Sequence, residues 1–593
     1  MKNILNSPVI YLTRKMYFYS RERRKYIIGV TLCFIIAGTI ESSKPLIFGY
    51  LLNSIQQNGV NKENIIFLCF ILFLLFLAEF LFWVFWGPAR ISEQKTAFIA
   101  KKNYKEYLLQ GSMGLPLAWH ADHHSGDTID KIDKGTNALF SFSEQTFMFV
   151  SAIVRIVVSF FALFFISVNA GILACITSII IFYIMFLYDK RLVPGYKIVN
   201  SAENKISEKI YDAMSNITTV IVLRIESLVF KSISRAIDRP YAQFRKNSIN
   251  NEWKWFYAAA LGQLTMILVL VIYLIGVVNK NEVILVGSIS VLFMYTSRVR
   301  ETFFNFAQMY NNAVKWKTNI MNAEELTKEF SSQNIITNQK NLPKNWSTIS
   351  INDLSFSYHD ETNADLHLDD VNVDFKKGEK IAVIGESGGG KTTFLNLFRG
   401  LYVPRSISLK IDTDKSVPDF NSISDSISLI PQDPEIFSTT IRENITLGVD
   451  YPLKEIRSFT DLASFSDIVD RLPNGLESTI VEKGVNLSGG EKQRLALARG
   501  LLASKDKDIV LLDEPTSSVD FHNELNIYEN IFKRFPEKTI ISSIHRLHLL
   551  PLFDTILFFK DGKIVSRGNL EYLKENSKDF QELWEKYLQT QNQ

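Results

Sequence analysis

The stretch that decides the fold is Gly385-Glu386-Ser387-Gly388-Gly389-Gly390-Lys391-Thr392. It matches the pattern G-x-x-x-x-G-K-[ST] at every fixed position. The apolar residues 380–384 before it have the composition of a buried strand, and residues 393–398 after it have that of a helix. This order predicts a loop whose backbone N–H groups converge on phosphate oxygens, with Lys391 on the β- and γ-phosphates and Thr392 on Mg²⁺.

A second apolar run, residues 508–512, ends in two acids, Asp513 and Glu514. In a nucleotide site, Asp513 would hold Mg²⁺ through water, and Glu514 would orient the attacking water as a base. Two acids at a strand end are also common in turns and helix caps, so this pair alone leaves both interpretations open.

The composition sets broad limits on the protein. A chain of 593 residues is too long for one hydrophobic core, so we expect at least two domains. The net charge of +3 is too small to indicate a nucleic-acid partner. The three cysteines, Cys33, Cys69 and Cys175, lie in apolar runs and suggest neither a disulfide framework nor a metal site.

The first half of the chain contains long uncharged stretches that are typical of membrane spans. Residues 147–188 contain only one charge, Arg155, and are too long for one crossing of a layer about 30 Å thick. They must fold back, most simply at 167–171. The predicted spans are about 26–52, 65–87, 143–166, 170–190, 255–279 and 283–304.

The distribution of Lys and Arg predicts the orientation of these spans. The segments before the first span, between the second and third, and between the fourth and fifth are rich in both residues, whereas the other connections have almost none. Cytoplasmic connections carry this excess. We therefore expect both termini and the second half of the chain on the cytoplasmic side of the plasma (inner) membrane.

Glu41, Glu79 and Arg155 are ionisable residues inside predicted spans. Such residues face a cavity or pair with one another rather than facing lipid. They are candidates for a substrate cavity, and pairing is the alternative; Glu41 and Lys44, for example, lie three residues apart.

These features predict a multi-domain membrane protein. Residues 1–330 form an all-α domain of six membrane helices with cytoplasmic helical extensions. Residues 331–346 are polar without periodicity and form a linker. Residues 347–593 form an α/β nucleotide-binding domain of the P-loop ATPase class.

Further motifs give the chain a specific resemblance. Residues 487–494 (LSGGEKQR), 431–434 (PQDP), 517–520 (SSVD) and 544–546 (IHR) occur in the second half together with the phosphate-binding loop. In order and spacing they resemble the signature, Gln-loop, D-loop and switch-histidine motifs of ATP-binding cassette (ABC) transporters. The whole chain resembles an exporter-type half-transporter; one departure is Glu491, where the family usually has Gln.

The resemblance implies roles for individual residues. Glu514, His545 and Gln432 would be catalytic, and Thr392, Gln432 and Asp513 would hold Mg²⁺. The residues implied to bind ATP are Tyr358, Gly385, Glu386, Ser387, Gly388, Gly389, Gly390, Lys391, Thr392, Thr393, Ser488, Gly489, Gly490 and Asp520. Residues 115–127 and 211–219 would be the short helices that dock on nucleotide-binding domains.

The resemblance also implies ATP and Mg²⁺ as cofactors and a dimer, because one chain supplies one phosphate-binding loop and one signature. A homodimer in a lipid bilayer is expected, and a heterodimer is compatible with the sequence. The expected function is ATP-driven export of an amphipathic or hydrophobic small molecule, peptide or lipid by alternating access. An importer (for example of a siderophore) and a lipid flippase are alternatives, as is an ATP-gated channel or regulatory ATPase.

Overall fold

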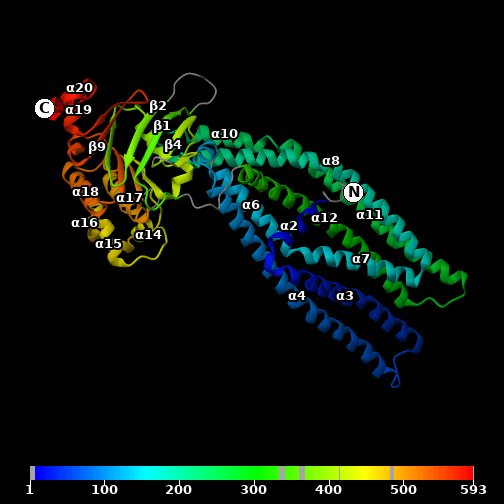
Figure 1. The fold of residues 1–593 in the computed structure, drawn as a ribbon. Coiled ribbons are helices and arrows are strands. Elements are labelled where there is room, and N and C mark those ends of the chain that lie inside the picture. Colours follow the sequence, from blue (N-terminus) through cyan, green and yellow to red (C-terminus); the bar gives the residue numbers. More distant parts are fainter. Residues whose placement is uncertain are drawn as a thin grey trace. The chain divides into compact units, whose positions relative to one another are not determined.

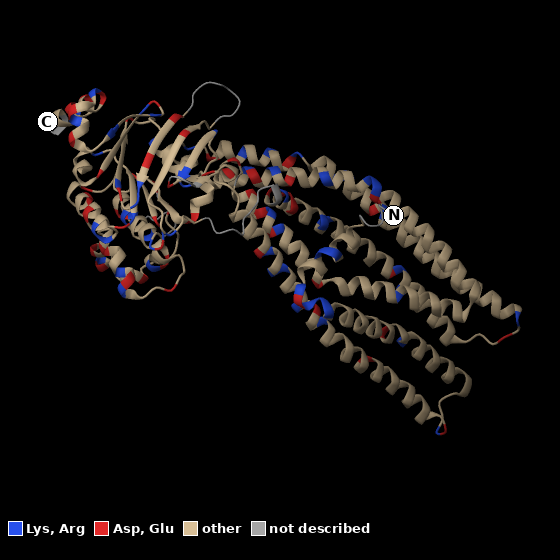
Figure 2. Ribbon diagram, viewed as in Figure 1, with Lys and Arg blue, Asp and Glu red and all other residues tan. Residues whose placement is uncertain are grey.

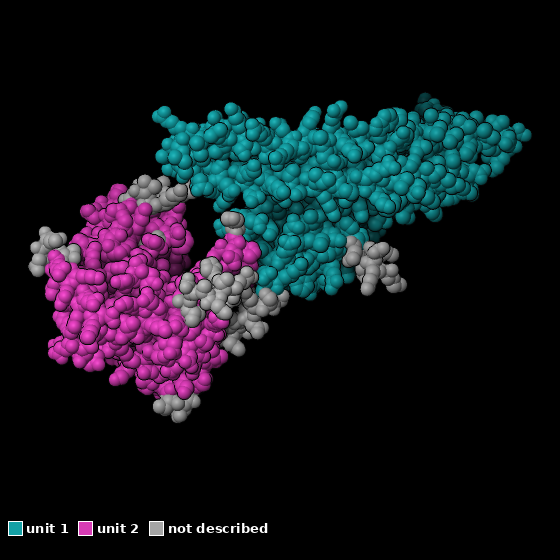
Figure 3. Space-filling view, turned by 90° about the horizontal axis from the view of Figure 1, so that it is seen from above, with its two compact units in different colours: residues 1–114, 125–333 teal, residues 115–124, 334–593 magenta. Residues whose placement is uncertain are grey.

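The computed structural model describes residues 7–123, 125–332, 341–358, 367–412, 415–433, 435–480 and 487–591. Contacts between residues divide the chain into two compact units, which Figure 3 colours separately. The first unit comprises residues 1–114 and 125–333, and the second comprises residues 115–124 and 334–593.

The first unit is built from helices, most of them long and side by side (Figure 1). They are α2 (Pro8–Tyr19), η1 (Arg21–Arg23), α3 (Arg24–Asn58), α4 (Ile65–Met113), α6 (Ser125–Glu144), α7 (Thr146–Ile166), α8 (Val168–Ser215), α9 (Ile217–Val222), α10 (Glu226–Asp238), α11 (Tyr241–Asn279) and α12 (Val286–Ser332). Residues 211–219, predicted to be one short docking helix, instead comprise the end of α8, which continues to Ser215, and the start of α9 at Ile217; the docking role stays a prediction.

Five helical segments of the described chain are long and apolar enough to cross a membrane: Arg21–Asn58, Ile65–Met113, Ser125–Ile166, Val168–Ser215 and Glu226–Asn279. Figure 2 shows long stretches without charge along these helices. The sixth predicted span, 283–304, falls in α12 and is not among the five. The first 18 residues of α12 include Arg298, Arg300 and Glu301, which lower its hydropathy.

Small residues allow α3 and α12 to approach each other closely. A Cβ atom at Gly287 would lie 1.9 Å from the carbonyl oxygen of Gly49, so neither backbone could approach as closely with a side chain there. Near this contact, Tyr295 Oη donates a hydrogen bond of 2.7 Å to the carbonyl oxygen of Ser42. Close packing of small residues and interhelical hydrogen bonds are the interactions that hold helices together where water is absent.

The second unit contains two sheets. The four-stranded sheet has the order β2-β1-β4-β5, with antiparallel neighbours, and the six-stranded sheet has the order β10-β9-β3-β8-β7-β6. All neighbours in the larger sheet are parallel except β10 and β9. The strands are β1 (Thr348–Phe356), β2 (Leu368–Lys376), β3 (Lys380–Gly385), β4 (Ser406–Ile411), β5 (Lys415–Val417), β6 (Ile427–Ile430), β7 (Ile509–Asp513), β8 (Thr539–Ser543), β9 (Thr555–Lys560) and β10 (Lys563–Gly568).

Helices surround these sheets. They are α5 (Leu117–Asp122), α13 (Lys391–Phe398), η2 (Phe420–Ser426), α14 (Ile441–Thr446), α15 (Leu453–Leu462), α16 (Ser466–Arg471), η3 (Gly475–Glu477), α17 (Gly489–Ala503), α18 (Phe521–Arg534), η5 (Leu547–Leu552), α19 (Leu570–Asn576) and α20 (Lys578–Gln591). The α5 helix belongs to this unit although it comes from the first half of the sequence.

Strand β3 lies between two hydrophobic cores. Its side chains alternate: Ile381 and Val383 belong to the core shared with the smaller sheet and α13, whereas Ala382 and Ile384 belong to the core under α14–α18. Because side chains of a strand alternate between faces, a strand buried on both faces is apolar throughout. This explains why residues before the phosphate-binding loop form an unbroken apolar run, and it fixes the loop at the carboxyl edge of the sheet.

Candidate functional site: a nucleotide-binding and hydrolysis site

The glycine-rich loop joins β3 to the N-terminus of α13. Gly388 and Gly390 have φ angles of 81° and 102°, which glycine adopts without the steric cost that other residues incur. A Cβ atom at Gly385 would lie 2.2 Å from the carbonyl oxygen of Phe559 on the neighbouring strand β9. The loop backbone therefore requires these glycines, and the loop leads directly into the N-terminus of α13, the positive end of a helix that favours anions.

Lys391 is the first residue of α13 and is buried. Its Nζ donates hydrogen bonds to the carbonyl oxygens of Gly385 (2.8 Å) and Glu386 (3.1 Å). Burial lowers the pKa of Lys391, and the nearby carboxylates of Glu514 and Asp513 partly oppose this effect. The ammonium group is thus held over the loop, where the charges of Glu514 and Asp513 affect its pKa.

Asp513 is the last residue of β7 and is 5% exposed. Its Oδ1 accepts hydrogen bonds from Thr392 Oγ1 (3.2 Å) and from Ser543 Oγ (2.6 Å). The structure therefore brings together two of the predicted Mg²⁺ ligands, Thr392 and Asp513. Hydroxyl and carboxylate oxygens are ligands that Mg²⁺ prefers, so these residues fit that metal.

Glu514 lies at the centre of the predicted catalytic group. Its Oε1 is 2.6 Å from His545 Nε2, and its Oε2 accepts a hydrogen bond of 3.0 Å from Gln432 Nε2. Its backbone N–H donates to Ser543 Oγ (3.0 Å), and its φ angle is 45°, a conformation that is unfavourable for a residue with a side chain. Such strain persists where the surrounding structure holds it and is common at functional sites.

Tyr358 lies near the other end of the loop. Its ring is 41% exposed and makes edge-on contacts with Phe356 and Tyr402. Its Oη donates to Thr393 Oγ1 at 3.3 Å, so the ring is fixed beside the start of α13. An exposed aromatic face in a fixed position can stack on a planar base.

The signature residues form the N-terminus of α17. Ser488 is the N-cap, and its Oγ accepts a hydrogen bond from the backbone N–H of Glu491 while a Glu491 carboxylate oxygen accepts one from the N–H of Ser488. This reciprocal capping box explains Glu491, the departure from the usual Gln, because either residue can accept the hydrogen bond. A Cβ atom at Gly489 would meet nothing within 4 Å, so this end of α17 is open.

Sequence reasoning missed several residues that connect the motifs. Gln493 donates to Ser517 Oγ (2.8 Å) and to the carbonyl oxygen of Gln432 (3.3 Å), and its Oε1 accepts from the N–H of Ser518. Arg546 donates to the carbonyl oxygens of Ser517 and Val519. Both residues lie inside recognised motifs, but the residue types Gln and Arg do not by themselves indicate which loops they connect. They hold the Gln-loop, D-loop and switch region in one arrangement.

The structure does not join every predicted ATP-binding residue within one chain. Asp520 caps α18 by accepting hydrogen bonds from Asn523. Among the described residues, no hydrogen bond connects residues 488–490 with the loop at 385–393. Within the described part of the single chain, the glycine loop and the N-terminus of α17 are therefore two separate elements, and anion binding by each stays a prediction.

Two family models match the chain. The ABC transporter transmembrane region matches residues 27–303, and the ABC transporter model for the nucleotide-binding part matches residues 368–517. The chain belongs to the ABC transporter family. This confirms the predicted exporter-type order of a helical membrane region followed by an α/β nucleotide-binding domain.

Individual ABC proteins are similar at moderate identity. ATP-binding cassette sub-family B member 6 of Mesocricetus auratus is 28% identical over 79% of this chain, but the match spans 56% of that protein's length, little more than half. The beta-(1→2)glucan export ATP-binding/permease protein NdvA of Brucella suis is 23% identical, over 96% of this chain and 93% of that protein. A solved bacterial Atm1-family ABC exporter with ATP bound has a TM-score of 0.79 at 20% identity, over 95% of this chain and 99% of that one, which shows a shared fold.

The charged candidates in the membrane region of this ABC protein differ from one another. Glu41 and Glu79 both form ion pairs with Lys44, and Glu41 also lies 4.0 Å from Arg298. Arg155 on α7 is partly buried and has no ion pair among the described residues. The two acidic candidates, Glu41 and Glu79, are therefore paired with cations of α3 and α12. The basic candidate, Arg155, forms no ion pair among the described residues.

Proposed function

We propose that this chain is one half of a dimeric ATP-driven exporter, with hydrolysis at the site around Glu514. The observation that supports this most strongly is the convergence of Gln432 and His545 on the two oxygens of Glu514, at 3.0 and 2.6 Å. A carboxylate held on both sides is positioned to orient a water molecule against a terminal phosphate.

The remaining residues of the site suit the other parts of this reaction. Lys391 and the loop N–H groups would bind the phosphates of ATP, and the exposed ring of Tyr358 would stack on the base. Thr392, Asp513 and the side-chain oxygen of Gln432 would hold Mg²⁺, which neutralises charge on the phosphates when bound. His545 would hold the terminal phosphate and keep Glu514 in place.

The open N-terminus of α17 supports a dimer. The hydroxyl group of Ser488 and the N–H group of Gly490, with the free space at Gly489, would complete the site of a second copy by donating hydrogen bonds to the terminal phosphate. Two ATP molecules bound between the nucleotide-binding domains would favour the closed dimer, because a ligand shifts an equilibrium toward the state that it binds more tightly. Closure would open the membrane region outward, and hydrolysis would reset it.

The substitution Glu514→Gln tests this proposal. We expect ATP turnover by the full-length protein in lipid nanodiscs to fall by about 100-fold or more, the usual contribution of a positioned base, while ATP stays bound. Glu529→Gln on the exposed side of α18 is the matched control and should keep wild-type turnover. Turnover by the Glu514→Gln protein within a few-fold of wild type would exclude Glu514 as the base.

Direction is tested separately, in inside-out vesicles. Because we place the nucleotide-binding domain on the cytoplasmic side, ATP added outside such vesicles should drive substrate into them. Accumulation against a gradient supports a pump, whereas equilibration without accumulation supports the channel alternative.

A further inference from the structure

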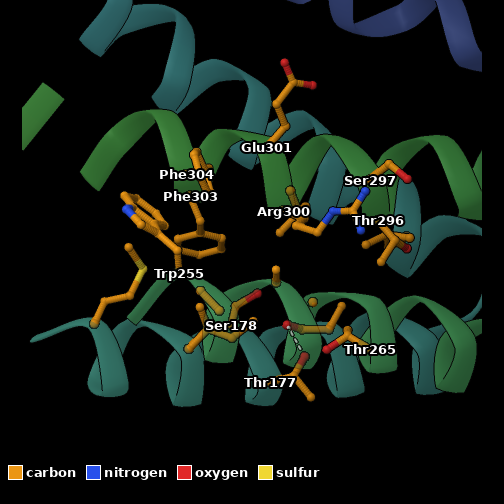
Figure 4. A pocket seen from close by; sticks show the side chains of 18 residues that line it. Thr177, Ser178, Trp255, Thr265, Thr296, Ser297, Arg300, Glu301, Phe303 and Phe304 are labelled. Atoms are coloured by element: carbon orange, nitrogen blue, oxygen red, sulfur yellow. Dashed lines mark hydrogen bonds between the residues drawn. The ribbon is translucent and has the colours of Figure 1, made fainter. Parts of the chain in front are cut away.

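The first unit contains a cavity of about 410 Å³ among α8, α11 and α12, with Leu163 of α7 at its edge. Its volume is in the range of small-molecule sites in proteins. Figure 4 shows its labelled side chains, which come from helices far apart in the sequence. None of the three charged residues suggested by the sequence, Glu41, Glu79 and Arg155, lines it.

Arg300 is the cation of this cavity. Its Nη1 donates a hydrogen bond of 2.7 Å to Gln263 Oε1, and it has no ion pair with any described carboxylate. Arginine carries five N–H donors, so most of its donors have no acceptor among the described residues. The neighbouring Glu301 is exposed and also lines the cavity; its side chain points away from Arg300 in Figure 4, and no ion pair joins the two residues.

The helix facing Arg300 leaves room for its side chain. A Cβ atom at Gly262 of α11 would lie 2.8 Å from Arg300 Cδ. The glycine therefore lets the aliphatic part of the arginine lie along α11 while the guanidinium extends along the cavity (Figure 4). An arginine inside a membrane region that forms no ion pair with a described carboxylate indicates a functional site.

The two ends of the cavity differ in character. At one end the rings of Trp255 and Phe304 lie 3.9 Å apart between centroids, with Phe303 beside them (Figure 4). At the other end Thr296 and Ser297 carry hydroxyl groups. Arg300 lies between the ends, so an anionic group on it would place an attached apolar body against the aromatic rings.

We propose that this cavity binds an amphipathic organic anion, an apolar or aromatic body carrying a carboxylate, sulfonate or phosphate group, and that such anions are the substrate class of the transporter. The statement that these anions are transported rests on the proposed function. The statement that the cavity binds them does not. Arg300 selects the charge, and Trp255 and Phe304 select the apolar body.

Two matched fluorescent probes test the charge selection. Anilinonaphthalene sulfonate carries an anionic group, and phenylnaphthylamine has nearly the same aromatic body without it. Binding is measured with the full-length protein in phosphatidylcholine nanodiscs, after subtraction of binding to empty nanodiscs. The variants are Arg300→Gln, Arg300→Lys and, as a control on the exposed surface of α11 outside the cavity lining, Glu252→Gln.

We expect Arg300→Gln to weaken sulfonate binding by about tenfold or more, the effect of losing a charge-assisted hydrogen bond, with less than about a threefold change for phenylnaphthylamine. Arg300→Lys should bind the sulfonate better than Arg300→Gln, and Glu252→Gln should match wild type. Unchanged sulfonate binding in Arg300→Gln, equal weakening of both probes, or an Arg300→Lys protein no better than Arg300→Gln would overturn the proposal.

The readouts separate this inference from the proposed function. A wild-type protein that binds the sulfonate through Arg300 but does not hydrolyse ATP would contradict the proposed function alone. A protein that hydrolyses ATP normally while its sulfonate binding ignores Arg300 would contradict the inference alone. Stimulation of ATP turnover by the sulfonate, lost in Arg300→Gln, would join the two.

Discussion

The nucleotide site and the membrane cavity differ in how many neighbouring side chains bind their charged residues. In the nucleotide site Glu514 is held by two side chains, and Asp513 accepts hydrogen bonds from two hydroxyl groups. In the cavity Arg300 donates a hydrogen bond to one neutral partner, Gln263, and forms no ion pair with a described carboxylate. A side chain that acts at a fixed position in a reaction is held there by hydrogen bonds from its neighbours. A side chain that binds a ligand keeps donors available for that ligand.

The substitution with the largest expected effect lies at the N-terminus of α17, which we propose completes the nucleotide site of a second copy. Gly489→Arg adds a large side chain where the single chain has free space, so the protein should fold normally. In a dimer that side chain would occupy the place of the opposing nucleotide, and ATP turnover should fall by about 100-fold or more. Glu529→Arg on α18 is the control. Normal turnover by Gly489→Arg would show that the end of α17 is not part of a site.

An effect of intermediate size is expected when the stabilities of variants at paired and unpaired charges of the membrane region are compared. Lys44→Met leaves Glu41 and Glu79 without their shared cation, and we expect a loss of about 1–3 kcal/mol, between the values for exposed and buried pairs. Arg155→Met removes a cation without an ion pair and should cost less. Thermal unfolding in nanodiscs measures both, and a larger loss for Arg155→Met would reverse the assignment of paired and unpaired residues.

The smallest effect concerns Glu491 at the signature. The N–H of Ser488 donates to this carboxylate, and together with the Ser488 hydroxyl and Arg471 it lowers the pKa of Glu491. A carboxyl group whose pKa is lower in the folded state stabilises the fold above its unfolded pKa, near 4.3, and this contribution is lost as the pH falls through the folded pKa.

Glu491→Gln keeps a capping acceptor but removes this titration. At pH 7 the unfolding free energy of the wild-type protein should exceed that of the variant by only about a few tenths of a kcal/mol, because Arg471, the cation that pairs with Glu491, is 66% exposed and solvent screens the pair. The difference should vanish below about pH 4. Thermal unfolding at both pH values checks this, and a difference that grows in acid would show that the sign is wrong.

The phosphate-binding loop and the acidic pair could be identified from the sequence because each is a contiguous motif, whereas Gln432 and His545 were implied only by the family resemblance. Residues 385–392 carry their loop geometry and chemistry in one short motif, and Asp513 and Glu514 follow directly on a strand. Ser543 was missed because it reaches Asp513 only through the pairing of β8 with β7, and strand order is not visible in a sequence. The same reason applies to Gln493, whose partners lie in loops far along the chain.

The membrane region was predictable in outline but not at its cavity. Uncharged stretches revealed five of the helices directly, since length and hydropathy depend on local composition. The contact of Glu79 with Lys44 joins α4 to α3, and the cavity around Arg300 joins α8, α11 and α12. Such sites depend on how helices pack, and packing of similar apolar surfaces leaves little trace in a single sequence.

The central claim is that each hydrolytic site is shared between two chains, and mixed dimers test it most directly. Lys391→Met destroys the loop of one chain and Gly489→Arg blocks the signature of the other, so homodimers of either variant lack an intact site. A mixed dimer purified through two different tags would combine the intact loop of one chain with the intact signature of the other. We predict that it recovers ATP turnover up to about half that of wild type, because one of its two equivalent sites is complete. Mixed dimers no more active than either parent variant would contradict the account.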